Sequence, residues 1–127
     1  MHTPKELLYS KSHEWVQFLD ETTARIGLTD YAQDALGDIV FVNLPEAGDS
    51  VAQGESFADV ESVKAVSDVF SPVDGEIAAV NEAVLDAPES INADPYGTWL
   101  IEVKDITGKE ELLDAAAYEA HCAEEAK

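Results

Sequence analysis

The sequence predicts a small, mostly β domain, a barrel or sandwich of short strands with helices at its margins. Three observations support this fold class. Short runs of β-branched and aromatic residues fill most of the chain, turn residues separate these runs, and an alanine-rich segment near the C-terminus has the composition of a helix. With 127 residues and no evident linker, the chain is expected to form one domain, residues 1–127.

The expected strands follow from runs of apolar residues bounded by turn signals. They are placed at 15–18, 22–28, 39–44, 57–63, 66–70, 77–80 and 98–104. Asp74-Gly75 predicts a turn before the strand at 77–80, and the polar segment 81–94 is expected to be a loop. The candidate core residues are the large apolar side chains of these strands: Trp15, Phe41, Phe57, Ile77, Trp99 and Ile101.

Two helical segments are expected. The first is a short internal helix at 31–36, because Thr29 is a favourable N-cap, Asp30 suits the positive end of the helix dipole, and Gly37 follows the last turn. The second is a helical tail at about 109–125, introduced by Gly108. Strands should therefore build the domain, and the helices should lie at its edges.

The charge is strongly negative, and it excludes two classes of partner. Asp and Glu number 27 against 7 Lys and Arg, so the net charge is −20. Such a surface repels nucleic-acid phosphates and anionic lipid, so neither nucleic acid nor membrane is an expected partner. Two explanations remain open: docking onto basic faces of partner proteins, and adaptation to a salty cytoplasm.

Cysteine and histidine usage predicts neither a disulfide nor a metal site. Cys122 is the single cysteine, which suits a reducing compartment. His2, His13 and His121 have no metal-ligand spacing, and His121 and Cys122 are expected on the helix surface. The N-terminal residues lack the pattern of a signal peptide and no apolar run is long enough to span a membrane, so a cytoplasmic location is expected.

The segment from Val60 to Val69 is symmetric about a lysine. Folded at the Lys64–Ala65 bond, it pairs like with like, Val60 with Val69 and Glu61 with Asp68 among them. This pattern predicts two antiparallel strands joined by a two-residue turn, with the lysine at the tip. The facing carboxylates cost up to about 1 kcal/mol, which invites a functional explanation, although a solvated surface turn explains the lysine equally simply.

This segment resembles a known attachment motif. The sequence Glu61-Ser62-Val63-Lys64-Ala65 is similar to the lipoyl-attachment motif of the glycine cleavage system H proteins. The resemblance covers nearly the whole chain, in the family's order, through these further segments: Ser12-His13-Glu14-Trp15, Gly27-Leu28-Thr29-Asp30-Tyr31-Ala32-Gln33, Leu36-Gly37-Asp38-Ile39-Val40-Phe41-Val42, Leu44-Pro45, Ser71-Pro72-Val73-Asp74-Gly75-Glu76-Ile77, Pro95-Tyr96, Leu112-Leu113-Asp114-Ala115 and Tyr118-Glu119.

The resemblance implies a fold and a set of site residues. The fold would be the barrel-sandwich hybrid, a flattened β-barrel shared by lipoyl and biotinyl domains, with its attachment hairpin at about 57–70. Lipoate would be joined covalently to Lys64. The residues that recognise the attachment motif would be Glu61, Ser62, Val63, Ala65 and Asp68, and the cleft that shelters the loaded arm would be lined by Ser12, Glu14 and Asp68.

The resemblance also implies a carrier without catalytic residues of its own. The arm would take the aminomethyl group of glycine from a pyridoxal-phosphate glycine decarboxylase (P protein) to an aminomethyltransferase (T protein), and a dihydrolipoamide dehydrogenase (L protein) would reoxidise it. A lipoate ligase, or a lipoyl synthase and transferase, would load the arm. The chain is expected to be a monomer, and brief docking with three enzymes suits small, weak interfaces with each of them.

Other classes of protein would share part of this pattern. A biotin carrier would share the fold, but its tip has methionines beside the lysine, where this chain has Val63 and Ala65. A lipoyl domain of a 2-oxo acid dehydrogenase would usually place Asp before the lysine. A hydrolase that uses carboxylate pairs is the alternative from a different class, although 27 acidic residues give such pairs by chance. Relay of lipoyl groups to other lipoyl domains is a secondary function that stays open.

Overall fold

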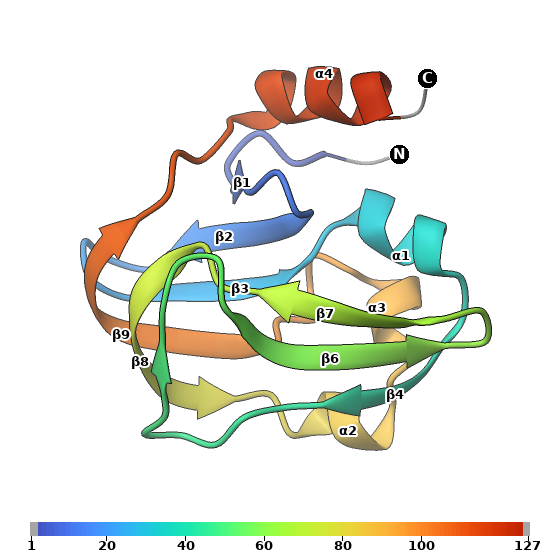
Figure 1. The fold of residues 1–127 in the computed structure, drawn as a ribbon, viewed down its shortest axis with the longest axis horizontal. Coiled ribbons are helices and arrows are strands. Elements are labelled where there is room, and N and C mark those ends of the chain that lie inside the picture. Colours follow the sequence, from blue (N-terminus) through green and yellow to red (C-terminus); the bar gives the residue numbers. More distant parts are fainter. Residues whose placement is uncertain (1–2, 126–127) are drawn as a thin grey trace.

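The computed structural model describes residues 3–125, which form two antiparallel sheets with helices at their edges (Figure 1). The larger sheet has the strand order β1-β2-β3-β9-β8-β5, and the smaller sheet has the order β4-β6-β7. The strands are β1 (Leu8–Tyr9), β2 (Glu14–Phe18), β3 (Ala24–Leu28), β4 (Ile39–Asn43), β5 (Ser50–Val51), β6 (Ser56–Ser62), β7 (Val66–Phe70), β8 (Val73–Val80) and β9 (Ile101–Lys109). The helices are α1 (Asp30–Leu36), α2 (Ala83–Asp86), α3 (Ser90–Ala93) and α4 (Ala115–Glu125).

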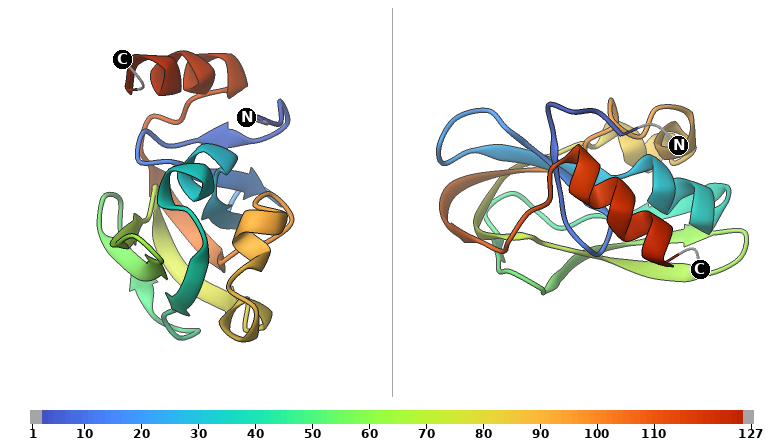
Figure 2. Two further views of the ribbon diagram at one scale, coloured as in Figure 1. Left: turned by 90° about the vertical axis from the view of Figure 1, so that its right-hand side faces the viewer. Right: turned by 90° about the horizontal axis from the view of Figure 1, so that it is seen from above.

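Three clusters of buried side chains hold these elements together. One lies between the smaller sheet and the three short helices, and includes Val60, Val69 and Ile91. A second lines the larger sheet around Ile77 and Ile101. The third packs α4 against the strands β1 and β2, and its members are Leu7, Tyr9, Trp15, Ala115, Tyr118 and Cys122. Figure 2 shows the resulting arrangement, with α4 across one end of the molecule.

The internal helix forms as its capping residues predict. The Thr29 side chain accepts a hydrogen bond from the backbone N–H of Ala32, and the N–H of Gly37 donates to the carbonyl of Gln33. Gly37 has φ of 82°, a left-handed conformation that glycine adopts without steric cost. The capped helix α1 lies between the β2–β3 side of the molecule and the β6–β7 hairpin (Figure 2).

The predicted turn at Asp74-Gly75 is wrong. Both residues lie inside β8, and the register of β8 with β9 shifts between Asp74 and Glu76. A Cβ at Gly75 would lie 2.6 Å from a methyl carbon of Val103, so the glycine allows two strands to approach closely rather than to reverse. The Asp74 carboxylate accepts hydrogen bonds from the backbone and side chain of Gln53.

The segment after β8 also differs from the expectation. Residues 81–94 form the two short helices α2 and α3, because Val84 and Ile91 turn inward and are both 1% exposed. The strand expected at 98–104 begins at Ile101 and continues to Lys109, with Gly108 inside it. The described C-terminal tail therefore holds one helix, which starts at Ala115 rather than near 109.

Two further side chains lie on the opposite side from the one expected. Phe41 is 52% exposed, because a register shift between Ile39 and Phe41 turns Ile39 and Val42 to the core instead. The Cys122 side chain faces inward from α4 into the buried cluster that contains Tyr118, and it is 3% exposed. No helix within residues 3–125 is long and apolar enough to cross a membrane.

Candidate functional site

Lys64 lies at the exposed apex of the hairpin between β6 and β7. Ser62 organises this turn through its side chain. The Ser62 hydroxyl oxygen accepts hydrogen bonds from the backbone N–H groups of Lys64 and Ala65, both at 3.1 Å, and the Ser62 N–H donates to the Ala65 carbonyl at 2.8 Å. A serine that bonds to the backbone two and three residues onward stabilises a tight turn. The lysine is therefore held on an ordered tip.

The predicted register of the hairpin is wrong. Glu61 was expected opposite Asp68, but the structure pairs Glu61 with Val66 and Asp68 with Asp59. The centre of the hairpin thus lies at the bond before Lys64 rather than at the bond after it. The partner of each residue moves by two positions, so the same side chains still face the core. A facing pair of carboxylates is present, but it is one step further from the tip.

The neighbouring strand explains the shift. The backbone N–H of Val63 donates to the carbonyl of Asp38 at 3.0 Å, on the side of the adjacent strand β4. This donor is therefore not available to β7, and the closing pair of the hairpin becomes Ser62 with Ala65. The symmetry of the sequence contains no information on this third strand.

The Lys64 side chain lies over the C-terminal end of α1. Its Nζ is 3.5 Å from the carbonyl oxygen of Ala35, and its Cε would lie 3.1 Å from a Cβ at Gly37. A glycine at this point leaves room for the aliphatic part of the lysine. The carbonyl end of a helix carries partial negative charge, which favours the ammonium group there.

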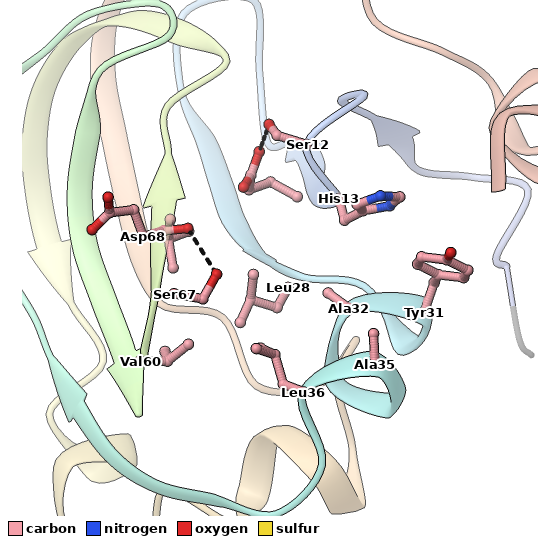
Figure 3. A pocket seen from close by; sticks show the side chains of 12 residues that line it. Ser12, His13, Leu28, Tyr31, Ala32, Ala35, Leu36, Val60, Ser67 and Asp68 are labelled. Carbon is pink, nitrogen blue, oxygen red and sulfur yellow. Dashed lines mark hydrogen bonds between the residues drawn. The ribbon is translucent and has the colours of Figure 1, made fainter. Parts of the chain in front are cut away.

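A pocket opens beside this end of the helix (Figure 3). Its volume is about 160 Å³. Segments far apart in the sequence provide its walls: the turn before β2, the end of β3, helix α1, and both strands of the hairpin. The lining residues are Ser12, His13, Glu14, Leu28, Tyr31, Ala32, Ala35, Leu36, Val60, Ser67, Asp68 and Val69. Ala35 belongs to this wall, and its carbonyl also contacts the Lys64 amine, so Lys64 lies against a residue of the pocket wall.

Glu14 is a buried carboxyl group in this pocket, 1% exposed. Its Oε1 accepts hydrogen bonds from the hydroxyls of Ser10 at 2.6 Å and Ser12 at 2.5 Å, and its Oε2 accepts one from the N–H of Phe70 at 3.3 Å. Burial, partly offset by these donors, raises the pKa of Glu14 to about 7. The group can therefore change its charge near neutral pH.

The structure brings Ser12, Glu14 and Asp68 to one pocket, but they contribute differently. Ser12 bonds directly to Glu14, whereas Asp68 is exposed and pairs with Asp59 on the outer face of the hairpin. Because side chains alternate along a strand, Ser67 faces the pocket and the Asp68 carboxylate faces away, as Figure 3 shows. Asp68 thus supplies negative charge near the rim.

Several members of the site were not predicted from the sequence. Ser10 is fully buried and donates to Glu14, and the alternation Ser10-x-Ser12-x-Glu14 was the available signal. His13, for which the sequence predicted no role in the site, lines the pocket and stacks on Tyr31, with ring centroids 4.6 Å apart. That α1 forms one wall of the pocket could not be predicted from the sequence, because it depends on how the helix packs against the strands.

The face of the hairpin that points away from the core carries exposed apolar side chains. Val63 and Val66 flank the lysine and are 66% and 65% exposed, and Phe41 and Val40 lie on the adjacent strand β4. Together, the fold and the site define a carrier: a β scaffold that presents one lysine amine on an ordered tip, beside a sheltered pocket and an exposed apolar surface.

Comparisons with known proteins identify the carrier. Residues 7–125 match the family described as Glycine cleavage H-protein. The chain is 60% identical to the glycine cleavage system H protein of Lachnoclostridium phytofermentans, over 94% of each chain, and 52% identical to the probable glycine cleavage system H protein of Pyrococcus abyssi, over 88% of this chain and 86% of the other. A crystal structure of a glycine cleavage system H protein from Mycobacterium marinum superposes with a TM-score of 0.88 at 42% identity, covering 94% of this chain and 98% of that one.

The chain belongs to the glycine cleavage H-protein family, and it is a non-catalytic lipoyl carrier of the glycine cleavage system. Members of this family normally carry lipoyl-lysine. Membership implies the P, T and L proteins of the system as partners. The alternatives of a biotin carrier and of a hydrolase are thereby set aside.

Proposed function

We propose that Lys64 is the lysine that carries the lipoyl group, joined through an amide to its Nζ. The observation that carries this proposal is the position of the amine, on an ordered hairpin tip and against Ala35, a residue of the pocket wall. The lipoyl group supplies a reversible dithiol, which the side chains of this protein lack, since Cys122 is its single cysteine.

The residues around Lys64 fit recognition by the enzyme that attaches the group. Val63 and Ala65 are exposed on either side of the lysine, and Glu61 is exposed one step below. Ser62 acts indirectly, because its hydroxyl fixes the turn that presents the amine. Asp68 adds negative charge on the outer face. We infer that the attaching enzyme recognises these exposed side chains, and that Ser62 determines the shape of the hairpin tip.

The pocket fits a cationic amine brought in at the end of the arm. Glu14 offers a carboxylate, and a cation beside it stabilises the charged form, so the pKa of about 7 falls when the amine arrives. Ser12 holds the carboxylate in place from one side. Leu28, Leu36 and Val60 form apolar walls that exclude water. We infer that the cargo rests there between enzymes.

The exposed apolar side chains near the tip fit brief contact with the partner enzymes. Phe41 and Val66 both lie level with Glu61 across the three strands, so they form one row on the outer face. Small contacts of this kind suit a monomer that must leave each enzyme in turn. The two sheets and the hairpin-borne lysine also support the barrel-sandwich hybrid as the finer description of the fold.

The test is lipoylation of Lys64→Arg, which keeps the charge but cannot accept the acyl group. The native protein and the variant are incubated with lipoate, ATP and a lipoate ligase, and intact mass is measured. The native protein should gain one lipoyl group and Lys64→Arg none, while the control Lys109→Arg should be modified normally. A lipoyl mass on Lys64→Arg would overturn the assignment.

A further inference from the structure

Two histidines that are distant in the sequence meet on the side of the pocket wall that faces α4. His13 belongs to the turn before β2 and His121 to α4, and their ring centroids are 5.6 Å apart. Glu125, one helical turn beyond His121, lies between them. Its carboxylate oxygens are 2.5 Å from Nε2 of His13 and 3.4 Å from Nε2 of His121. The sequence showed no metal-ligand spacing because the fold alone brings His13 to the helix.

These three side chains have the chemistry of a transition-metal site. One ligand atom from each residue lies within 4.8 Å of the other two. In a tetrahedral zinc site with bonds of about 2.1 Å, ligand atoms lie about 3.4 Å apart, so small side-chain rotations suffice. Two imidazoles and one carboxylate form a known zinc set that leaves a fourth position for water. The side chains are 16%, 23% and 40% exposed for His13, His121 and Glu125, so an ion can enter from solvent.

The surroundings of His13 prepare its Nε2 as a ligand. Its Nδ1 lies 2.7 Å from the hydroxyl of Tyr118, which in turn lies 2.6 Å from the Thr29 hydroxyl. A partner of this kind on the second ring nitrogen is what fixes the tautomer of metal-binding histidines.

The backbone of His13 is consistent with a functional constraint. Its φ is 75°, in the left-handed region, which residues other than glycine adopt only at a steric cost. The stacking with Tyr31 and the hydrogen bond with Tyr118 hold the ring in this place. His121 has a competing interaction, since its Nε2 lies 3.0 Å from the carbonyl of Lys11; this exposed carbonyl can turn to water when the imidazole binds an ion.

We propose that His13, His121 and Glu125 form a zinc-binding site that fastens α4 to the turn before β2. His13 also lines the pocket, so an ion at this site fixes the position of one pocket wall. The site requires no contribution from the lipoyl group, and it does not depend on which lysine carries that group.

The test uses the protein without the lipoyl group, because a dithiol would itself bind zinc. Zn²⁺ affinity is measured by competition with a chromophoric chelator, and the imidazole nitrogens are followed by NMR. We expect one ion per chain, shifts of the His13 and His121 rings, and a higher thermal midpoint with Zn²⁺. Loss of a residue that only supports a metal ligand lowers metal affinity by about 10- to 100-fold. His121→Ala removes a ligand itself, so it should lower Zn²⁺ affinity by more than this, and Glu125→Gln should also weaken binding.

Two controls separate this site from adventitious binding. Glu119→Gln removes one charge from the same helix, and Cys122→Ala removes the thiol; both should bind Zn²⁺ like the native chain. Equal affinity in the native protein and His121→Ala would overturn the proposal, because it would place the ion on the acidic surface. NMR shifts confined to His2 would overturn it as well.

Discussion

The buried carboxyl group of Glu14 gives the sharpest quantitative prediction. Its pKa is about 7 in the folded protein against an ordinary value of 4.5, mainly because burial disfavours the charged form. The folded state therefore holds this proton over a pH range in which the unfolded chain has released it. By linkage, the contribution of Glu14 to stability is greatest below pH 4.5 and is lost as pH rises through 7.

The magnitude follows from the two pKa values. One pKa unit corresponds to 1.36 kcal/mol, so the full shift is worth about 3 kcal/mol. Between pH 5 and pH 8, where the protein stays above its pI of about 4.1, the change is about 2.5 kcal/mol. Glu14→Gln removes the titration. Its amide replaces one of the two acceptor oxygens that Ser10, Ser12 and Phe70 donate to, but the cost of that mismatch does not vary with pH.

The assay is urea denaturation of the native protein and Glu14→Gln at pH 5, 6, 7 and 8, at constant ionic strength. All other groups titrate in both proteins, so the difference in unfolding free energy isolates Glu14. The native protein should lose about 2.5 kcal/mol relative to the variant between pH 5 and pH 8. A difference that stays constant over this range would show that the pKa of Glu14 is not raised, and would refute the reasoning.

Three further predictions concern the pocket, the tip and the charge. Glu14→Ala should fold and accept lipoate but lose its loaded aminomethyl group to water faster than the native protein. The assay separates each loaded protein from the decarboxylase and follows the release of formaldehyde and ammonia. Equal release from the native protein and Glu14→Ala would show that Glu14 does not protect the cargo. Ser62→Ala removes the acceptor for the N–H groups of Lys64 and Ala65, so these amides should exchange with solvent faster, whereas unchanged protection would contradict the role of Ser62. The net charge of −20 predicts a higher thermal midpoint in molar KCl than in dilute buffer, because the Debye length falls to about 3 Å; an unchanged midpoint would refute this.

Local signals in the sequence determined several parts of this protein. The two ends of α1 could be predicted because Thr29 and Gly37 each act within one turn of the helix. The two strands of the hairpin could be predicted because the alternation of apolar and polar residues and the turn residues act over a few positions. The identity of the family also lay in the sequence, in motifs spread along nearly the whole chain. Lys64 could be singled out in this way without knowledge of any contact.

Tertiary structure decided what depends on a third element. The hairpin register follows from the bond between Val63 and Asp38, and the close approach at Gly75 follows from packing on Val103. Glu14 gains its raised pKa only because the folded chain removes it from water. His13 meets His121 only because α4 packs across β1 and β2. Burial and long-range pairing create these properties, and neither is encoded in the spacing of neighbouring residues.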